Sequence, residues 1–152
     1  MTDPIAFAAS TPRHDLPTLF AGQAQKEFTL NEALARIDAL LQPVVEGEAN
    51  APSASPSEGE SWIVGSAPTG SWGGHAGSLA SYTAGNWLFA APVRGMRVFD
   101  KAAGRYAIWD NGWTRAAAVA APTGGTTADT QARAAIAGLI AALKLAKVLP
   151  PA

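Results

Sequence analysis

The sequence predicts an α+β protein in which a helix, a small antiparallel β module and a second helix follow one another. Two stretches, near residues 30–41 and 136–146, carry apolar residues at the spacing of an amphipathic helix. Between them lie short runs rich in aromatic and branched residues, separated by turns that contain glycine. Because strands and helices do not alternate, a parallel nucleotide-binding sheet is disfavoured.

Composition divides the 152 residues into five segments. They are an N-terminal arm with a first helix (1–46), a linker (47–59), the β module (60–115), a second linker (116–128) and a C-terminal helix (129–152). The linkers are rich in Ala, Pro, Gly, Ser and Thr, a composition typical of segments that build no core. The arm is expected to be extended, since residues 1–21 hold three prolines and no sustained apolar period.

The first helix is expected to begin near Thr29. Thr29 and Glu32 have the spacing of a capping box, in which each side chain satisfies a free backbone N–H of the first turn. A preceding helical turn over 23–27 stays an open alternative, and Pro43 ends the helix. The apolar stripe of this helix consists of Leu30, Leu34, Ile37 and Leu41.

The β module is expected to contain five or six short strands. Two hairpin turns are indicated, one at Gly85-Asn86 and one at Asn111-Gly112, because such pairs adopt the positive φ angles of tight turns. Another turn contains Gly104. The strands are expected over residues 61–64, 79–83, 87–90, 96–99 and 105–109, followed by a last one that starts at Trp113.

All five tryptophans lie in the β module, and most are interpreted as core residues because each buries a large area. Trp72 differs, since it lies in the glycine-rich run GSWGGHAG with no strand pattern to bury it. Two interpretations stay open for it. Trp72 packs on its own domain or on a neighbouring chain, or it stacks on a sugar ring with His75 and Ser71 as hydrogen-bonding groups.

The C-terminal helix is expected over 130–148 and is rich in alanine. Ile136, Leu139, Leu143 and Ala146 alternate spacings of three and four, which is the seam of a coiled coil. Two heptads are too short to hold a coiled coil alone, because short isolated helices are marginal in water. The helix therefore either joins copies that are already held together elsewhere or folds back on its own sheet.

The sequence favours a protein without enzymatic activity, metal or cofactor. It contains no Cys, and its two histidines, His14 and His75, have no partner at metal-ligand spacing. No P-loop, dinucleotide fingerprint or nucleophile motif occurs. Glu58, Glu60, Asp100 and Asp110 are the candidate carboxylates for glycan hydrolysis, but their places in a linker and in turns explain them adequately.

Charge and hydropathy disfavour nucleic acid and membrane as partners. The net charge is −1 and only 15% of residues are charged, which leaves little field to attract a polyanion. Residues 1–10 lack the features of a secretory signal, so the chain is expected to be made without a signal peptide. The longest apolar stretch is interrupted by Lys144 and Lys147 and is too short to cross a bilayer.

Three runs of the sequence resemble the DUF2793 family over about residues 11–115. They are PRHDLPTLFAGQAQKEFTLNEALARIDALLQPVVEG, GESWIVG and YTAGNWLFAAPVRGMRVFDKAAGRYAIWDNGW. The most specific part holds Gln23, Gln25 and Lys26, which helix capping and amphipathicity alone do not require. The resemblance implies a component of phages, prophages or gene transfer agents, where members often form the N-terminal part of tail-fibre or spike proteins.

The resemblance further implies that the first helix anchors or trimerises a fibre and that the β module is next along its axis. An adaptor, a fibre base and a minimal spike are all consistent with one module and a short helix. The expected partners are other copies in a homotrimer, other virion proteins and, in the alternative function of carbohydrate-binding attachment, a host surface polysaccharide. The expected interface residues are Leu30, Leu34, Ile37, Leu41, Ile136, Leu139 and Leu143, with Trp72 and His75 for carbohydrate.

Overall fold

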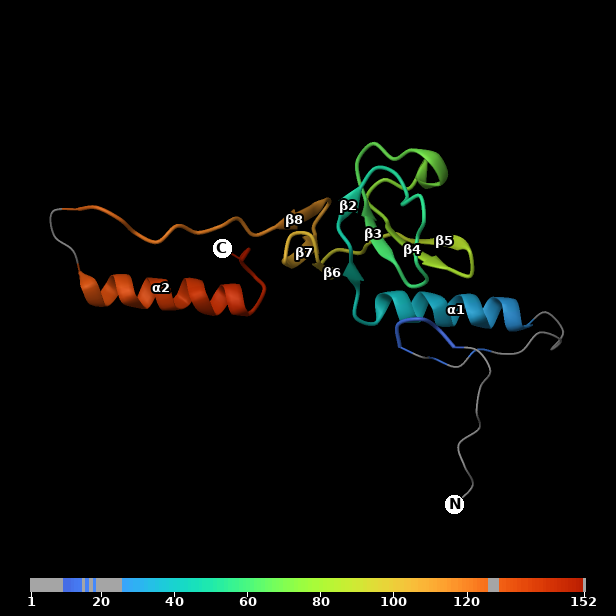
Figure 1. Cartoon of the computed structure of the whole chain (residues 1–152), viewed down its shortest axis with the longest axis horizontal. Helices are drawn as coiled ribbons and strands as arrows, with labels where there is room; N and C mark the ends of the chain where they lie inside the picture. Colours follow the sequence, from blue (N-terminus) through green and yellow to red (C-terminus); the bar gives the residue numbers. More distant parts are fainter. Residues whose placement is uncertain (1–9, 15, 17, 19–25, 126–128, 152) are drawn as a thin grey trace, which may run out of the picture. The chain divides into compact units, whose positions relative to one another are not determined.

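The structure is a computed structural model that describes residues 10–14, 16, 18, 26–125 and 129–151 (Figure 1). Within the first helix, side chains are described from Leu30 onward. The chain divides into two compact units, Met1–Pro92 and Val93–Ala152. This division falls inside the segment 60–115, which the sequence predicted as one β module, so its strands belong to two units.

The first unit is built from one helix and a small mixed sheet. Strands β2, β3, β4 and β5 are hydrogen-bonded in that order, with β2 parallel to β3 and the other pairs antiparallel. The elements of this unit are α1 (Lys26–Leu40), β1 (Val44–Val45), β2 (Glu48–Ala49), β3 (Ser61–Val64), the 3₁₀ turn η1 (Gly70–Trp72), β4 (Leu79–Thr83) and β5 (Asn86–Ala90).

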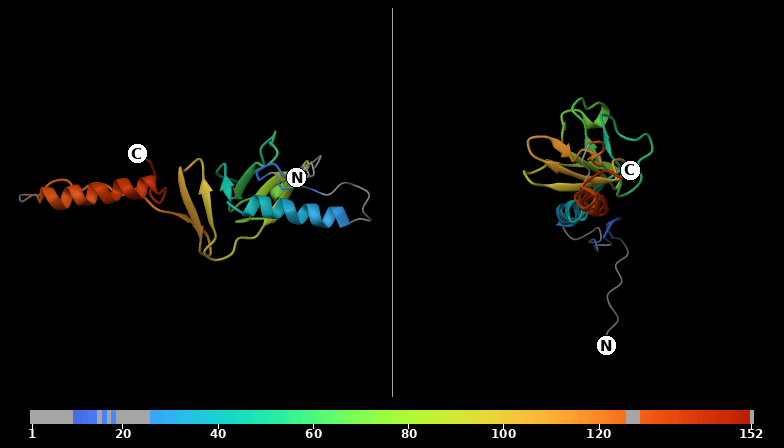
Figure 2. Two further views of the ribbon diagram at one scale, coloured as in Figure 1. Left: turned by 90° about the horizontal axis from the view of Figure 1, so that it is seen from below. Right: turned by 90° about the vertical axis from the view of Figure 1, so that its left-hand side faces the viewer.

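The two faces of this sheet are covered by different elements. Side chains alternate between the faces along each strand, so Ser81 and Leu88 share the face that carries α1 (Figure 2). The residues between β3 and β4 cover the other face, where Trp72 of η1 packs on Val64 and Ala80. The unit therefore has three layers, with the sheet between a helix and a folded loop.

The second unit joins an antiparallel meander to the second helix. β6 (Arg97–Asp100), β7 (Arg105–Trp109) and β8 (Trp113–Arg115) pair in chain order, and α2 covers Thr130–Leu145. The carboxylate of Asp100, which is buried, accepts a hydrogen bond from Nε of Arg115 at 2.7 Å and forms an ion pair with its Nη2 at 2.6 Å. This pair ties the first strand of the meander to the last.

The α+β class and most strand positions are confirmed. Ser61–Val64, Leu79–Thr83 and Arg105–Trp109 have the predicted bounds, and Gly104 has the positive φ that its turn requires. The strand pairs within 60–115 are antiparallel, as predicted, and the parallel pair is made by β2, which lies before that segment. Part of the predicted linker 47–59 is thus a strand, which two residues are too short to reveal by alternation.

Two local predictions are also wrong. The first helix begins at Lys26, three residues before the expected cap at Thr29, so residue 29 lies within the helix. The hairpin of β4 and β5 turns at Ala84-Gly85, because Thr83 pairs with Asn86. Both turn residues have positive φ, 49° and 76°, and an alanine gives no sequence signal for that conformation. Gln23 and Gln25 lie outside the described residues.

Candidate interaction surface

The predicted apolar stripe of α1 points away from the sheet of its own unit. Leu30, Ile37 and Leu41 are 46%, 50% and 60% exposed, and Leu34 is half-buried. With 3.6 residues per turn, the four side chains fall within about 60° of one another. Single exposed leucines are common on protein surfaces, whereas a continuous row of four on one helix indicates an interaction surface.

The opposite side of α1 packs on the sheet through Ala39, Leu40 and Arg36. Ala39 lies against Ser81 of β4, and Leu40 lies beside Leu88 of β5. Arg36 reaches β5, where Nη1 donates to the carbonyl of Phe89 at 3.0 Å. Its Nε and Nη2 donate to the Glu32 carboxylate one turn earlier, at 3.0 and 2.8 Å. The inward side of the helix therefore holds one large aliphatic residue, whereas Leu30, Ile37 and Leu41 are exposed.

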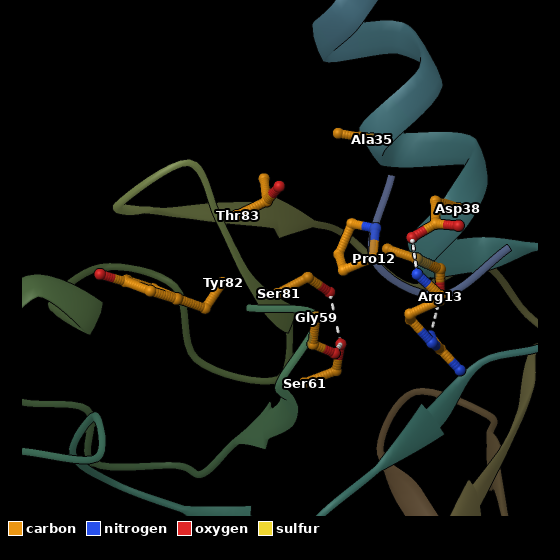
Figure 3. A pocket seen from close by; sticks show the side chains of 10 residues that line it. Pro12, Arg13, Ala35, Asp38, Gly59, Ser61, Ser81, Tyr82 and Thr83 are labelled. Atoms are coloured by element: carbon orange, nitrogen blue, oxygen red, sulfur yellow. Dashed lines mark hydrogen bonds between the residues drawn. The ribbon is translucent and has the colours of Figure 1, made fainter. Parts of the chain in front are cut away.

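Residues 11–14 form a strap that holds α1 at its C-terminal end (Figure 3). The carboxylate of Asp38, only 2% exposed, accepts the backbone N–H groups of Arg13 at 3.0 Å and His14 at 2.6 Å. The Arg13 guanidinium donates to the carbonyls of Ala39 at 3.0 Å and Gln42 at 2.8 Å. These bonds satisfy carbonyls that a helix end leaves without intrahelical partners.

The strap is also seated beside the sheet. Pro12 lies close to Gly59, where a Cβ would come within 3.2 Å of the proline ring. Thr11, which is buried, donates its N–H to the carbonyl of Leu16 at 2.9 Å, and its hydroxyl accepts the N–H of Leu16 at 3.1 Å. The arm is thus folded at this point, although its composition predicted only an extended segment.

Asp38 was not among the predicted interface residues, although its position in the helix carries one signal. A carboxylate near the C-terminal end of a helix opposes the helix dipole and is locally unfavourable. Such a conflict indicates that the residue has a partner elsewhere in the fold. Nothing in the sequence identified residues 13 and 14 as that partner, because they contribute backbone groups.

The apolar stripe of the second helix is also exposed. Ile136, Leu139 and Leu143 are 40%, 65% and 41% exposed, and no residue of α2 is buried. The helix begins at an Asp129 cap whose side chain accepts two backbone N–H groups. Arg133 of its first turn donates to carbonyls of the preceding linker, those of Pro122 and Gly124.

The far end of α2 is attached to the meander of the same unit. Leu149, just beyond the helix, is buried, and the carbonyl of Lys147 accepts the N–H of Tyr106 in β7 at 2.9 Å. Pro151 lies close to Gly104, where a Cβ would come within 3.1 Å of its ring. The chain after α2 thus packs on the sheet, while the helix itself presents its stripe to solvent.

Of the two interpretations left open for Trp72, the structure agrees with packing on its own domain and not with stacking on a sugar ring. The Trp72 side chain is fully buried, with its ring 5.1 Å from that of Trp87 in an edge-to-face arrangement. The Asn50 side chain and carbonyl hold the loop by accepting bonds from Ala67 and Thr69. No local pattern around Asn50 indicated that its groups would close the loop over the sheet.

His75 is close to Trp72 in the fold but does not form an open aromatic platform with it. Its ring stacks on Phe89 of β5 at 3.7 Å with an interplanar angle of 5°. His75 is half-buried and its backbone N–H donates to the carbonyl of Trp72. A sugar ring could reach Trp72 only if this loop opened, which would expose the core of the first unit.

The four carboxylates considered for glycan hydrolysis all make structural contacts. Those contacts join Glu58 to the N–H groups of Ala84 and Gly85, Glu60 to the indole of Trp62, Asp100 to Arg115, and Asp110 to Arg94. Within the described residues, no group of three or more His, Asp or Glu side chains could hold a metal ion. In the same part of the chain, no helix is long and apolar enough to cross a membrane.

These features define a small α+β protein whose two helices each turn an aliphatic stripe outward. Residues 30–114, more than half of the chain, match the family described as "Protein of unknown function (DUF2793)", so the chain belongs to that family. The match begins at Leu30, the first stripe residue of α1, and ends in β8. No curated protein matches the chain.

Proposed function

We propose that this protein is a non-enzymatic structural component of a phage-like particle: a tail fibre, a spike or an adaptor that anchors a fibre. Copies of the chain assemble through the outward stripes of α1 and α2. The observation that carries the proposal is the seating of α1, which turns Ala39 to the sheet and Leu30, Ile37 and Leu41 to solvent. A lone soluble domain would gain stability from the reverse seating, since burial of large aliphatic side chains is favourable.

The partner we propose for these stripes is the same chain. In a closed symmetric oligomer, each copy offers its neighbours the same surface, so apolar rows on identical helices cover one another. Taken as a coiled-coil seam, α1 has Leu34 and Leu41 at position a and Leu30 and Ile37 at position d. Since only one of the two d residues is an isoleucine, the seam does not select the number of copies, and the homotrimer is proposed because fibres are usually three-fold.

The stripe of α2 supports the same mode of assembly. Ile136, Leu139, Ile140 and Leu143 cover about 100° of the helix circumference, wider than the seam of a two-stranded coil. A helix of this length is marginal by itself in water. Contacts among α2 helices of neighbouring copies would stabilise it beyond its attachment at residues 147–151.

The particle itself is proposed from the resemblance to proteins of phages, prophages and gene transfer agents. Under this proposal the chain is made in the bacterial cytoplasm and ends in the virion beside other virion proteins, with no role for nucleic acid or membrane insertion. Purified particles from a bacterium that encodes the chain should contain it, in a fixed ratio to the major capsid protein. Particles that carry none of the protein, made while the gene is expressed, would rule out the proposal.

The proposed interface has a direct test in solution. Leu34→Asp places a charge in the centre of the α1 stripe and should convert the oligomer to monomers, because a carboxylate is costly to bury without a partner. Gln42→Asp, an exposed position just past the helix and off the stripe, is the matched control and should leave the solution mass unchanged. Equal masses for both variants and the parent would remove α1 from the interface.

Carbohydrate-binding attachment remains a prediction without a site at Trp72. Binding of the intact protein to a surface polysaccharide of the host would have to use exposed groups elsewhere on the chain. Loss of such binding in Trp72→Ala would be uninformative unless the variant keeps its fold, since Trp72 is a core residue.

A further inference from the structure

The strap at residues 11–14 and the stripe of α1 belong to the same helix, and their positions are coupled. Asp38 follows Ile37 directly, so the buried carboxylate and the exposed stripe residue are about 100° apart around the helix. The two backbone bonds to Asp38 and the two Arg13 bonds to the helix end fix α1 both in rotation and along its axis. Any turn of the helix about its axis would break all four.

We infer that Asp38 is a positioning residue for the proposed interface: with the strap, it holds α1 in the rotation that keeps the aliphatic stripe available to other copies. The role of the stripe as an interface rests on the proposed function, whereas the bonds that hold the helix lie within a single chain. The role inferred for Asp38 differs from a general role in stability because it predicts which face of the helix is turned inward.

The chemistry of Asp38 makes it suited to this role. A buried carboxylate needs hydrogen-bond donors, and here two backbone N–H groups of another segment provide them at 2.6 and 3.0 Å. Turning the helix so that Leu30, Ile37 and Leu41 met the sheet would leave this charge unpartnered. The strap therefore opposes the apolar collapse that would hide the stripe against Ser61 and Ser81 of the chain's own sheet.

The absence of Cys from the sequence allows a clean measurement of helix rotation. Single-cysteine variants Ala39→Cys, on the inward side, and Ile37→Cys, on the stripe, are labelled with a thiol reagent at a concentration where the chain is monomeric. In the parent background, the thiol at position 37 should react fast and the one at position 39 slowly. For the test, Asp38→Asn is added to each cysteine variant. The control adds Glu32→Gln instead, which loses only the exposed pair with Arg36.

Asp38→Asn should raise the labelling rate at position 39 by about tenfold to a hundredfold, the factor that corresponds to loss of a hydrogen bond to a charged group. The rate at position 37 should fall at the same time, while Glu32→Gln changes neither. An unchanged rate at position 39 would overturn the inference. Equal rises at both positions would also overturn it, because the helix would then leave the sheet rather than turn on it.

A folding control and a second variant distinguish rotation of the helix from loss of the fold. The near-ultraviolet circular dichroism of the Trp62, Trp72 and Trp87 cluster, on the other face of the sheet, reports whether the first unit remains folded. If Asp38→Asn removes that signal, the test uses Arg13→Ala instead, which deletes only the bonds to Ala39 and Gln42. The labelling rates at positions 37 and 39 in that variant then show whether the helix has turned. Because the rates are measured on monomers, a chain that never assembles can still confirm the strap while it contradicts the proposed function.

Discussion

Trp72 is the residue on which the core of the first unit depends most. It is the largest fully buried side chain, and it contacts residues of β3, β4 and β5 from a loop that has only a single 3₁₀ turn of its own. Its indole N–H has no hydrogen-bond acceptor among the described residues, but the edge-to-face ring of Trp87 offers a π surface 5.1 Å away. The loop is thus held by an aromatic contact as well as by the Asn50 bonds.

Trp72→Ala should lower the free energy of unfolding by about 3–5 kcal/mol, the usual cost of truncating a buried aromatic. Urea unfolding followed by far-ultraviolet circular dichroism measures it. Ser71→Ala, at the exposed neighbouring position, is the control and should change stability by no more than about 0.5 kcal/mol. Similar small effects for both variants would mean that the loop is not part of the core.

Two aspartates of the second unit should differ strongly in their contribution to stability. Asp100 is buried and also accepts the N–H of Ala103, whereas Asp110 pairs with Arg94 at the surface. Asp100→Asn should cost about 3 kcal/mol, because it leaves the Arg115 charge without its counter-ion in a largely buried place. Asp110→Asn should cost about 0–1 kcal/mol. Thermal unfolding of the two variants compares them, and equal losses would contradict this account.

At the scale of elements, the β4–β5 turn can be improved by one substitution. Ala84 has a φ of 49°, a left-handed conformation that costs an ordinary L residue roughly 1 kcal/mol. Ala84→Asn creates Asn-Gly, the preferred pair for this turn, and should raise the free energy of unfolding by about 0.5–1 kcal/mol. Denaturant unfolding tests this, with Gly85→Ala as the opposite control that should destabilise the hairpin. A destabilised Ala84→Asn would contradict the turn assignment.

Helices and strands were predicted correctly where the residue pattern within the element was clear. Strands such as Ser61–Val64 and Arg105–Trp109 combine aromatic or branched residues with flanking turns, and their bounds were predicted correctly. β1 and β2, at two residues each, are held by their neighbours and have no period of their own. The start of α1 was misplaced because Thr29 offered a plausible cap inside a helix that had already begun.

The residues of the candidate surface on α1 could be predicted from the sequence, but the direction in which they point could not. The spacing of Leu30, Leu34, Ile37 and Leu41 identified one stripe, yet it gives no information on whether a sheet or solvent lies in front of it. That orientation depends on long-range contacts, chiefly those of Asp38 with residues 13 and 14. The choice between the two interpretations of Trp72 was left open for a similar reason, since the bonds that close its loop are accepted by the distant Asn50.

At the scale of the whole molecule, α2 offers a second test of assembly that is independent of α1. Leu143→Asp places a charge on its stripe, and Ala141→Asp places the same charge on the exposed opposite side of the same helix. The first variant should weaken the oligomer, because the stripe is proposed to be covered by other copies, and the second should not. Sedimentation velocity measures both, and an equal effect of the two substitutions would indicate that α2 contributes no specific interface.

The solution mass of the unmodified chain, measured by light scattering during size exclusion over a wide range of concentration, tests directly whether copies of the chain assemble. A closed oligomer is expected, with a mass three times the 15.6 kDa of one chain for the proposed homotrimer. A mass of 15.6 kDa at every concentration would contradict it, because the stripes of α1 and α2 would then remain uncovered by other copies.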